Sequence, residues 1–361
     1  MMNLLKKYAW HISIIGQKRI SLHLKIFLAV VACTACLVTL IWYNTLRRNR
    51  GNIGCFFRDG NVLAELRPQE PLIGAPIFFH ETSCHGSEDI YFKQRQACSV
   101  ESALLAHPEK NVFLLISRPV TIPLHQTRNV LIRELMTYPN FRVRHISFTK
   151  YLSGTPLVDL GESGLLSSES SYPVAHASDI LRYATLYKFD GIYLDLDVLV
   201  LKPLGKLNNF AGAESDSSIG SGILGFGGDA VGREIARDCV EELRSTFDGR
   251  IWGHNGPGVI TRVLQRRCNT SSVLGMNKER CQGFDALPVE SFAPFPFRAV
   301  DIFFTEDKKG LIPRLLNRTY AIHFWNKFSS NIVIQNNSNV PFVHYARTYC
   351  PKVFKIVNGQ F

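Results

Sequence analysis

The chain has 361 residues and carries a net charge of +11 at neutral pH. Its first 50 residues contain eight Lys or Arg and no Asp or Glu, whereas the remainder is nearly balanced, with 33 basic and 30 acidic residues. Because the basic excess belongs to one terminus and does not spread over a folded domain, it argues against a nucleic-acid-binding surface, and no nucleic-acid partner is expected.

The first predicted element is an apolar helix at residues 26–43. These 18 residues contain no charge, and as a helix they would span about 27 Å, enough for a thin bilayer. The small residues that a signal-peptidase site needs, such as Ala32 and Thr34, lie inside the segment, which favours a retained signal anchor over a cleaved signal peptide. We therefore expect a single-pass type II membrane protein with a cytoplasmic tail at 1–25, an anchor at 26–43, a stem at 44–74 and one lumenal domain at 75–361.

Seven of the nine cysteines follow the predicted anchor. In an oxidising lumen we expect local disulfides such as Cys84–Cys98 and Cys268–Cys281, and the odd number leaves at least one cysteine free or bonded to another chain. Lumenal exposure also agrees with three glycosylation sequons, at Asn269, Asn317 and Asn336.

Apolar strands and helices alternate through the first half of the domain. The pattern predicts strands at 76–79, 112–116 and 142–146, a helix at 99–107 that stops before Pro108, a helix at 179–189 capped by Ser178 or Asp179, and strands at 192–194 and 198–201. This alternation favours an α/β domain with a mainly parallel sheet. Ligands of such sheets bind outside the carboxyl ends of the strands.

Two carboxylates, Asp195 and Asp197, follow the apolar run Ile192–Leu194. In extended chain, residues two apart point to one face, so both carboxylates can reach a single hard cation while Leu196 points into the core. Magnesium and manganese are bound in this way, by one or two carboxylates together with substrate phosphate oxygens. Asp-x-Asp also occurs by chance, but its place at the end of a buried strand, where unpaired charge is costly, favours a metal site.

The later part of the domain looks irregular. Residues 220–228 are rich in glycine, and residues 292–297 are aromatic and rich in proline. We expect loops in both places, and acceptor sites of enzymes are often built from such loops.

Four motifs then occur in order along the domain. They are SDILRY at 178–183, GIYLDLD at 191–197, WGHNGPG at 252–258 and YAIHFWNK at 320–327. Their order and spacing resemble the Asp-x-Asp-containing α1,4-glycosyltransferases, the family of the lactosylceramide 4-alpha-galactosyltransferases and of α1,4-N-acetylgalactosaminyltransferases. The segments FFHETS at 78–83 and CSVESA at 98–103 are also similar to that family's opening strand and first helix.

The resemblance implies a GT-A-like fold, a UDP-sugar donor, the cofactor Mn²⁺ and retention of anomeric configuration. Asp195 and Asp197 would bind the metal and the ribose-diphosphate, and His323 would complete the metal site. Lys327 would meet the phosphates as a point charge. A core histidine between Ile322 and Phe324 is the structural alternative for His323.

The resemblance also assigns residues to the two substrates. Asp179 and Arg182, one turn apart on a helix, would hydrogen-bond the donor sugar or ribose, unless they form only an exposed ion pair. His254 and Asn255 would contact the acceptor, or else belong to a structural loop. At Ser221 the vertebrate galactosyltransferases have an Asn before a Gly, and the smaller Ser leaves room for an acetamido group, so the donor is UDP-galactose or UDP-N-acetylgalactosamine.

No catalytic residue is assigned. Metal and cations near the phosphates can stabilise departing UDP without a protein acid, so we expect a same-face, oxocarbenium-like substitution. A double displacement would need a carboxylate beneath the anomeric carbon, for which Asp216 and Asp229 are the nearest guesses.

The leading interpretation is a Golgi type II membrane enzyme that adds galactose or N-acetylgalactosamine, α1,4-linked, to a terminal sugar of a glycosphingolipid. Two alternatives stay open. One is an inactive lumenal carbohydrate-binding or chaperone-like protein, although charged ligands kept beside apolar strands argue against it. The other is a transferase that acts on glycoproteins. Whether the chain forms a homodimer is also open.

Overall fold

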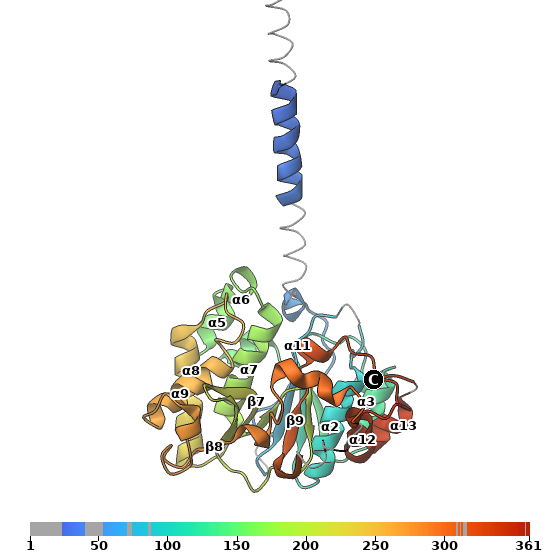
Figure 1. Ribbon diagram of the computed structural model, residues 1–361, viewed down its shortest axis with the longest axis vertical. Coiled ribbons are helices and arrows are strands. Elements are labelled where there is room, and N and C mark those ends of the chain that lie inside the picture. Colours follow the sequence, from blue (N-terminus) through green and yellow to red (C-terminus); the bar gives the residue numbers. More distant parts are fainter. Residues whose placement is uncertain are drawn as a thin grey trace, which may run out of the picture. The chain divides into compact units, whose positions relative to one another are not determined.

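The computed structural model describes residues 24–39, 53–70, 74–85, 88–307, 310, 312, 316–357 and 359–361. The chain divides into two compact units, Met1–Gly51 and Asn52–Phe361. Figure 1 draws the described residues of both units as coloured ribbons.

In the first unit, residues 24–39 form a helix with exposed side chains, drawn in blue in Figure 1. The hydroxyl groups of Thr34 and Thr39 donate to the carbonyls of Val30 and Ala35, at 3.0 and 2.9 Å, so the helix satisfies its own polar side chains. Among the described residues, none of the helices is both long enough and apolar enough for a membrane span. The predicted tail and anchor extend beyond the described residues and stay predictions.

The second unit is built on a seven-stranded sheet. In spatial order its strands are β3 (Phe141–His145), β2 (Val112–Ile116), β1 (Ile77–Glu81), β4 (Gly191–Leu194), β7 (Ser218–Phe226), β6 (Phe210–Ser215) and β8 (Asp285–Leu287). The first four run parallel, β7 is antiparallel to both of its neighbours, and β8 is parallel to β6. The predicted α/β domain with a mainly parallel sheet is confirmed.

Both faces of this sheet are buried, which explains why its first strands are continuous apolar runs. Along β1, Ile77 and Phe79 belong to one hydrophobic cluster and Phe78 to the other, because alternate side chains leave opposite faces. One face is covered by α7 (Pro173–Phe189), α8 (Ala230–Thr246) and α9 (Pro257–Arg267), and the other by α2 (Gln94–Ala106), α3 (Val130–Leu135), α12 (Pro341–Tyr349) and α13 (Pro351–Ile356) (Figure 1).

The predicted boundary of α7 is wrong at its start. The helix begins at Pro173, where a proline fits the first turn, and neither Ser178 nor Asp179 is its N-cap. The predicted end is confirmed, because the chain leaves the helix at Asp190 with a left-handed φ of 53°. Helix α2 likewise begins earlier than predicted, at Gln94, and ends before Pro108 as expected.

The glycine-rich segment predicted as a loop is in fact the strand β7. Sequence propensity disfavours glycine in strands, but here tertiary packing outweighs that preference. A Cβ atom on Gly225 would lie only 2.1 Å from the ring of Phe210, so glycine makes room for an aromatic side chain of the neighbouring strand. The glycines therefore mark close approaches to the strand surface.

A second sheet contains two antiparallel strands, β5 (Val198–Val200) and β9 (Ala321–His323). Val198 lies opposite His323 in this pair. The sheet therefore brings a histidine from late in the chain beside the Asp-x-Asp segment that immediately precedes β5.

Shorter helices connect these elements. They include the α-helices α4 (Phe148–Leu152), α5 (Val158–Glu162), α6 (Leu165–Ser168) and α11 (Asn326–Ser329), and the 3-10 helices η1 (Gly54–Phe57), η3 (Leu124–Gln126), η4 (Val273–Gly275), η5 (Val289–Ser291), η6 (Phe297–Phe303) and η7 (Leu316–Arg318).

Three disulfides join the described residues. Cys268–Cys281 is confirmed, but the predicted Cys84–Cys98 pair is wrong, because Cys84 bonds to Cys55 and Cys98 bonds to Cys350. Cys98–Cys350 spans 252 residues and ties α2 to the start of α13, a distant partner that local spacing cannot reveal. Cys239 stays free and buried, as the odd count requires.

Candidate active site

Asp195 and Asp197 lie in the turn that connects β4 to β5. The N–H of Asp195 donates to the carbonyl of Gly222 at 2.8 Å, and the N–H of Val198 donates to the carbonyl of Asp195 at 3.1 Å. A tight turn, and not the predicted alternation along a strand, therefore brings the two carboxylates together. Leu196 between them packs against the hydrophobic core, as predicted.

His323 lies beside both carboxylates. Its Nε2 atom is 3.1 Å from Asp197 Oδ1 and 4.0 Å from Asp195 Oδ2, and its ring stacks on Trp325 with centroids 4.1 Å apart. The other oxygen of Asp197 accepts a hydrogen bond of 2.6 Å from the N–H of Asn326. His323 is therefore packed against an aromatic ring on one side and paired with a carboxylate on the other.

The charged forms of Asp197 and His323 stabilise each other. Burial lowers the pKa of His323, but the neighbouring Asp197 carboxylate outweighs burial and raises the pKa to about 9. Burial raises the pKa of Asp197, but the charge and hydrogen bond of His323 outweigh it, and the pKa is lowered. In this arrangement an imidazolium at neutral pH balances the buried carboxylate.

The geometry fits a divalent cation. Among the described residues, Asp195, Asp197 and His323 form the group whose ligand atoms all lie within 4.8 Å of one another. Two carboxylate oxygens and one imidazole nitrogen suit manganese or magnesium, and the charge that a cation would bring now comes from protonated His323. These three residues, named the metal cluster here for the cation that they could hold, are brought together as predicted. That they bind a metal, and that this metal is manganese, stay predictions.

Arg182 on α7 holds the other side of the site. Its guanidinium lies 3.1 Å from Asp179 Oδ1 and 3.3 Å from Asp195 Oδ1, and it donates to the carbonyl of Ser221 at 2.7 Å. It also lies over the ring of Tyr193, whose hydroxyl donates to Asp195 at 2.6 Å. Arg182 thus links α7, β4 and β7 through one buried cation.

The alternative of an exposed Asp179–Arg182 ion pair is wrong, because each residue is only 5% exposed. Burial raises the pKa of Asp179 to about 7, although the charge of Arg182 opposes this shift. The guanidinium of Arg182 is therefore held in place by two carboxylates of the protein. The donor contacts predicted for Asp179 and Arg182 stay predictions.

Ser221 turns away from the metal cluster. Its side chain is 4% exposed, and its hydroxyl accepts a hydrogen bond of 3.1 Å from Arg182. Gly220 and Gly222, its neighbours along β7, face the other side of the sheet, because successive residues of a strand alternate between the two sides. The donor contact predicted for Ser221 stays a prediction, and in this structure its hydroxyl positions Arg182.

Lys327 lies between two aromatic rings. Its ammonium group is 3.8 Å from the ring centroid of Trp252 and 4.9 Å from that of Tyr172. Burial lowers its pKa. Lys327 follows Asn326, whose N–H donates to Asp197, so the backbone of Lys327 lies next to the metal cluster. Its predicted role at the phosphates stays a prediction.

The segment WGHNGPG at 252–258 packs against α7. The amide oxygen and nitrogen of Asn255 are bonded to the backbone of Asp248 at 3.0 and 2.8 Å, and the side chain is fully buried. His254 Nε2 lies 2.7 Å from the carbonyl of Thr246. A Cβ atom on Gly256 would lie 2.3 Å from Asp179 Oδ1. These contacts shape a loop against the site, and acceptor binding by His254 and Asn255 stays a prediction.

One carboxylate near the site was missed by sequence reasoning. Glu214 on β6 interacts electrostatically with His323, Asp195 and Arg182, and burial raises its pKa. Asp229, one of the two guesses, caps α8 by accepting from the N–H of Gly232 at 2.9 Å. Asp216, the other, is exposed in the β6–β7 turn. No sequence signal marks Glu214, because it lies outside every motif.

A small cavity of about 20 Å³ adjoins the metal cluster. Its lining comes from β6, β7, β9 and the segment after η5, and consists of Gly212, Ala213, Glu214, Gly220, Gly222, Ile223, Phe292, Ala293 and His323. Apart from Glu214 and His323, all of these residues are glycine or apolar. Two ionisable side chains therefore face one small space.

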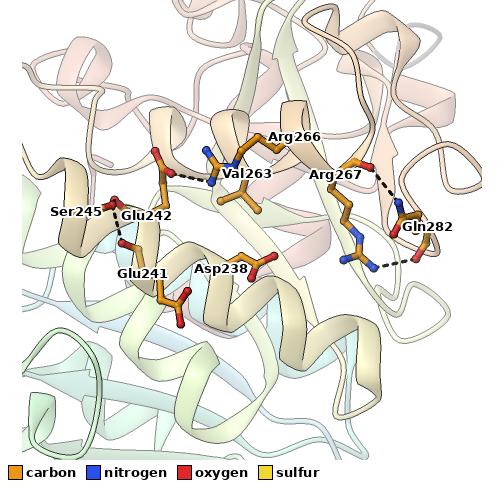
Figure 2. Close-up of a pocket in the computed structure, with 8 residues that line it drawn as sticks. All are labelled: Asp238, Glu241, Glu242, Ser245, Val263, Arg266, Arg267 and Gln282. Atoms are coloured by element: carbon orange, nitrogen blue, oxygen red, sulfur yellow. Dashed lines mark hydrogen bonds and ion pairs between the residues drawn. The ribbon is translucent and has the colours of Figure 1, made fainter.

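A larger hollow of about 620 Å³ lies between α8 and α9 and shares no residue with the metal cluster. Figure 2 shows its lining, in which Arg266 contacts Glu242 and Arg267 donates to the carbonyl of Gln282. Arg266 pairs with Glu242 at 2.7 Å, and Arg267 pairs with Glu234 at 3.2 Å. Because both of these arginines already have partners in the protein, the hollow gives no indication of an anionic ligand.

Two family models match the chain on either side of β7. The glycosyltransferase sugar-binding region containing DXD motif matches residues 93–217, and the alpha 1,4-glycosyltransferase conserved region matches residues 229–357. The first includes Asp179, Arg182, Asp195, Asp197 and Glu214, and the second includes His254, Asn255, His323 and Lys327. The metal cluster is therefore assembled from both matched regions.

Individual relatives agree with these matches. The lactosylceramide 4-alpha-galactosyltransferase of Mus musculus is 35% identical over 283 residues, which are 78% of this chain and 76% of that protein. The Homo sapiens protein of the same name is 32% identical, over 76% of this chain and 75% of that protein. The alpha-1,4-N-acetylglucosaminyltransferase of Homo sapiens is 26% identical, over 72% of this chain and 75% of that protein.

Among solved structures, the galactosyltransferase LgtC in complex with donor and acceptor sugar analogs aligns with a TM-score of 0.38 and 12% identity, over 78% of this chain and 96% of that chain. A likeness at this TM-score carries no weight for the fold. The GT-A-like topology stays a prediction.

Replacing Arg182 should destabilise the domain strongly. Arg182→Met removes the cation between Asp179 and Asp195 and leaves buried charge uncompensated, so we expect the free energy of unfolding to fall by about 3–5 kcal/mol. Chemical denaturation measures this change. Arg244→Met is the matched control, since its pair with Asp159 is exposed and should be worth about 1 kcal/mol or less. Equal losses in the two variants would contradict the assigned role of Arg182.

Protonation of His323 should make the stability of the metal-free protein depend on pH. Its folded pKa of about 9 lies above the usual 6.5, so the stabilisation is fully present below about pH 6.5 and is lost as pH rises through 9. In EDTA, the difference in unfolding free energy between wild type and His323→Gln should shrink from pH 6.5 to pH 9.5. A difference that stays constant over this range would exclude a charged His323.

Proposed function

The chain belongs to the α1,4-glycosyltransferase family that includes the lactosylceramide 4-alpha-galactosyltransferases. We propose that it transfers a hexose from a UDP-sugar to a terminal sugar of a glycosphingolipid, with retention of anomeric configuration. The enzyme is a hexosyltransferase. The observation that carries the proposal is the convergence of Asp195, Asp197 and His323 from two distant segments. Such a cluster suits a cation that binds a diphosphate.

The protein side chains hold this site in a defined geometry. Asp195, Asp197 and His323 would hold the cation, which we propose is Mn²⁺ and which when bound supplies positive charge against the diphosphate of the donor. Arg182 and the Tyr193 hydroxyl orient Asp195, and the N–H of Asn326 orients Asp197. Fixed carboxylates lose little freedom when ligand binds.

Two positive side chains would meet the donor's negative charge. Arg182 is already oriented by Asp179 and Asp195, so its charge is fixed near the site. Lys327 is held by aromatic rings and not by a carboxylate in any ion pair of the described residues, which leaves its ammonium available to a phosphate. A phosphate oxygen is a good partner for such an ammonium.

UDP-galactose and UDP-N-acetylgalactosamine are the donors that we propose. The names of the relatives given above include two different sugars, galactose and N-acetylglucosamine. Membership of the family therefore does not by itself select one sugar. Ser221, where a larger amide stands in the resembling galactosyltransferases, supports acceptance of the acetamido sugar. In this structure any such influence passes through Arg182, which the Ser221 hydroxyl contacts.

We further propose a Golgi membrane location with single-pass type II topology. The uncharged segment 26–43, the basic residues on both sides of it and the exposure of the sequon residues Asn269 and Asn317 support this topology. In sealed Golgi vesicles, the domain should resist added protease until detergent opens the membrane. Digestion without detergent would contradict the topology.

A donor and acceptor panel tests the function. The full chain in detergent, with Mn²⁺, should transfer galactose or N-acetylgalactosamine to a glycolipid with a terminal β-linked galactose. Transfer only to glycoprotein acceptors would instead support the glycoprotein alternative. Absence of transfer from every UDP-sugar, with carbohydrate still bound, would support the inactive carbohydrate-binding alternative.

Asp197→Asn should reduce transfer by about 100-fold or more, because it removes a ligand charge while an amide oxygen can still accept from the N–H of Asn326. Initial rates of sugar transfer measure the loss. Asp216→Asn is the matched control, because it makes the same chemical change at an exposed position. Equal activity of Asp197→Asn and wild type would remove the metal cluster from the reaction.

A further inference from the structure

The β6–β7 hairpin presents an unassigned carboxylate to the active site. Glu214 is partly buried, and none of the hydrogen bonds or ion pairs identified among the described residues uses its carboxylate. A partly buried carboxylate without a hydrogen-bond donor in the protein loses some hydration and gains nothing in exchange, so it is an unusual feature of a purely structural side chain. By contrast, Asp195 and Asp197 both have hydrogen-bond partners in the protein.

Gly220 and Gly222 on β7 form a strip of backbone without side chains between Glu214 and the metal cluster. A Cβ atom on Gly222 would lie 2.8 Å from Asp195 Oδ2 and 3.1 Å from His323 Cε1. A Cβ atom on Gly220 would lie 2.8 Å from Glu214 Oε1. The two glycines are two residues apart and face the same side of the strand, so the strip between these contacts is about 7 Å long.

The cavity described above adjoins this strip and is lined by both Glu214 and His323. Phe292 and Ala293 form its apolar wall. In a UDP-sugar, the anomeric carbon is bonded directly to an oxygen of the diphosphate, so a diphosphate bound at the Asp195–Asp197–His323 cluster holds the sugar close to that cluster. A sugar that extends over the glycine strip would therefore meet the Glu214 carboxylate.

We propose that Glu214 is a catalytic residue whose carboxylate faces the transferred sugar and stabilises positive charge at its anomeric carbon. In the transfer, the bond between the anomeric carbon and the diphosphate oxygen breaks, and UDP leaves with the electron pair. The acceptor hydroxyl oxygen forms the new bond to that carbon, and its proton passes to a phosphate oxygen of the departing UDP. Glu214 stays ionised and forms no bond.

This inference rests on the proposed transferase function and names a residue for it. The two carboxylates guessed from the sequence do not fit the role. Asp229 is occupied as the cap of α8 and by the amides of Asn208 and Asn209. Asp216 is exposed at the tip of the hairpin and does not line the cavity.

Glu214→Gln tests the charge, because it keeps the shape of the side chain. With the full chain, Mn²⁺ and the UDP-sugar that wild type uses, we expect kcat to fall about 100-fold or more, the scale for loss of one stabilising group. The dissociation constants of Mn²⁺ and of UDP, which lacks the sugar, should stay within about threefold of wild type. Asp216→Asn, in the same hairpin, should leave kcat and both dissociation constants unchanged.

Three outcomes would overturn the assignment. An active wild type with an equally active Glu214→Gln removes Glu214 from catalysis and leaves the transferase function intact. Loss of Mn²⁺ or UDP binding in Glu214→Gln shows that Glu214 supports the metal cluster and not the sugar. A wild type that transfers no sugar at all overturns the proposed function, and this inference falls with it.

Discussion

The site depends on the compensation of two carboxylates that are largely withdrawn from water. Asp195 and Asp197 occupy one turn, and each needs a positive partner because unpaired buried charge is costly. Arg182 supplies that charge to Asp195 at 3.3 Å, and His323 supplies it to Asp197 at 3.1 Å. The first partner comes from α7 and the second from β9, so folding must bring these elements to the same turn. Both charges are therefore compensated only when α7 and β9 are packed against this turn.

The two compensating cations differ in chemistry. A guanidinium stays charged throughout the physiological pH range, whereas the charge of an imidazole depends on pH and a neutral imidazole is a metal ligand. Arg182 is therefore a permanent part of the framework. His323 can balance Asp197 as a cation or join Asp195 and Asp197 as a ligand. The same pocket is thus stable as a folded structure and suited to a divalent ion.

The elements that local sequence controls were predicted well. The strand at 112–116 was predicted to the residue, and the end of α7 followed from the Asp190-Gly191 turn. The cluster of Asp195, Asp197 and His323 was also predicted, but only because the motifs resemble a known family. Spacing alone does not place His323 near a turn more than 100 residues earlier.

Contacts between distant segments account for what was missed. The glycines of β7 look like loop residues until Phe210 is seen packed over Gly225. Cys98 has a partner at Cys350, 252 residues away, which a search for local pairs overlooks. Glu214 has no motif around it, and its importance comes from what faces it across the glycines of β7.

Electron paramagnetic resonance of Mn²⁺ bound to the full chain can show whether Asp195, Asp197 and His323 hold a cation that binds the donor diphosphate. This arrangement of ligands predicts a ¹⁴N coupling that disappears in His323→Ala, and a ³¹P coupling that appears when UDP is added. A spectrum without nitrogen coupling in wild type, or without phosphorus coupling in the presence of UDP, would contradict it.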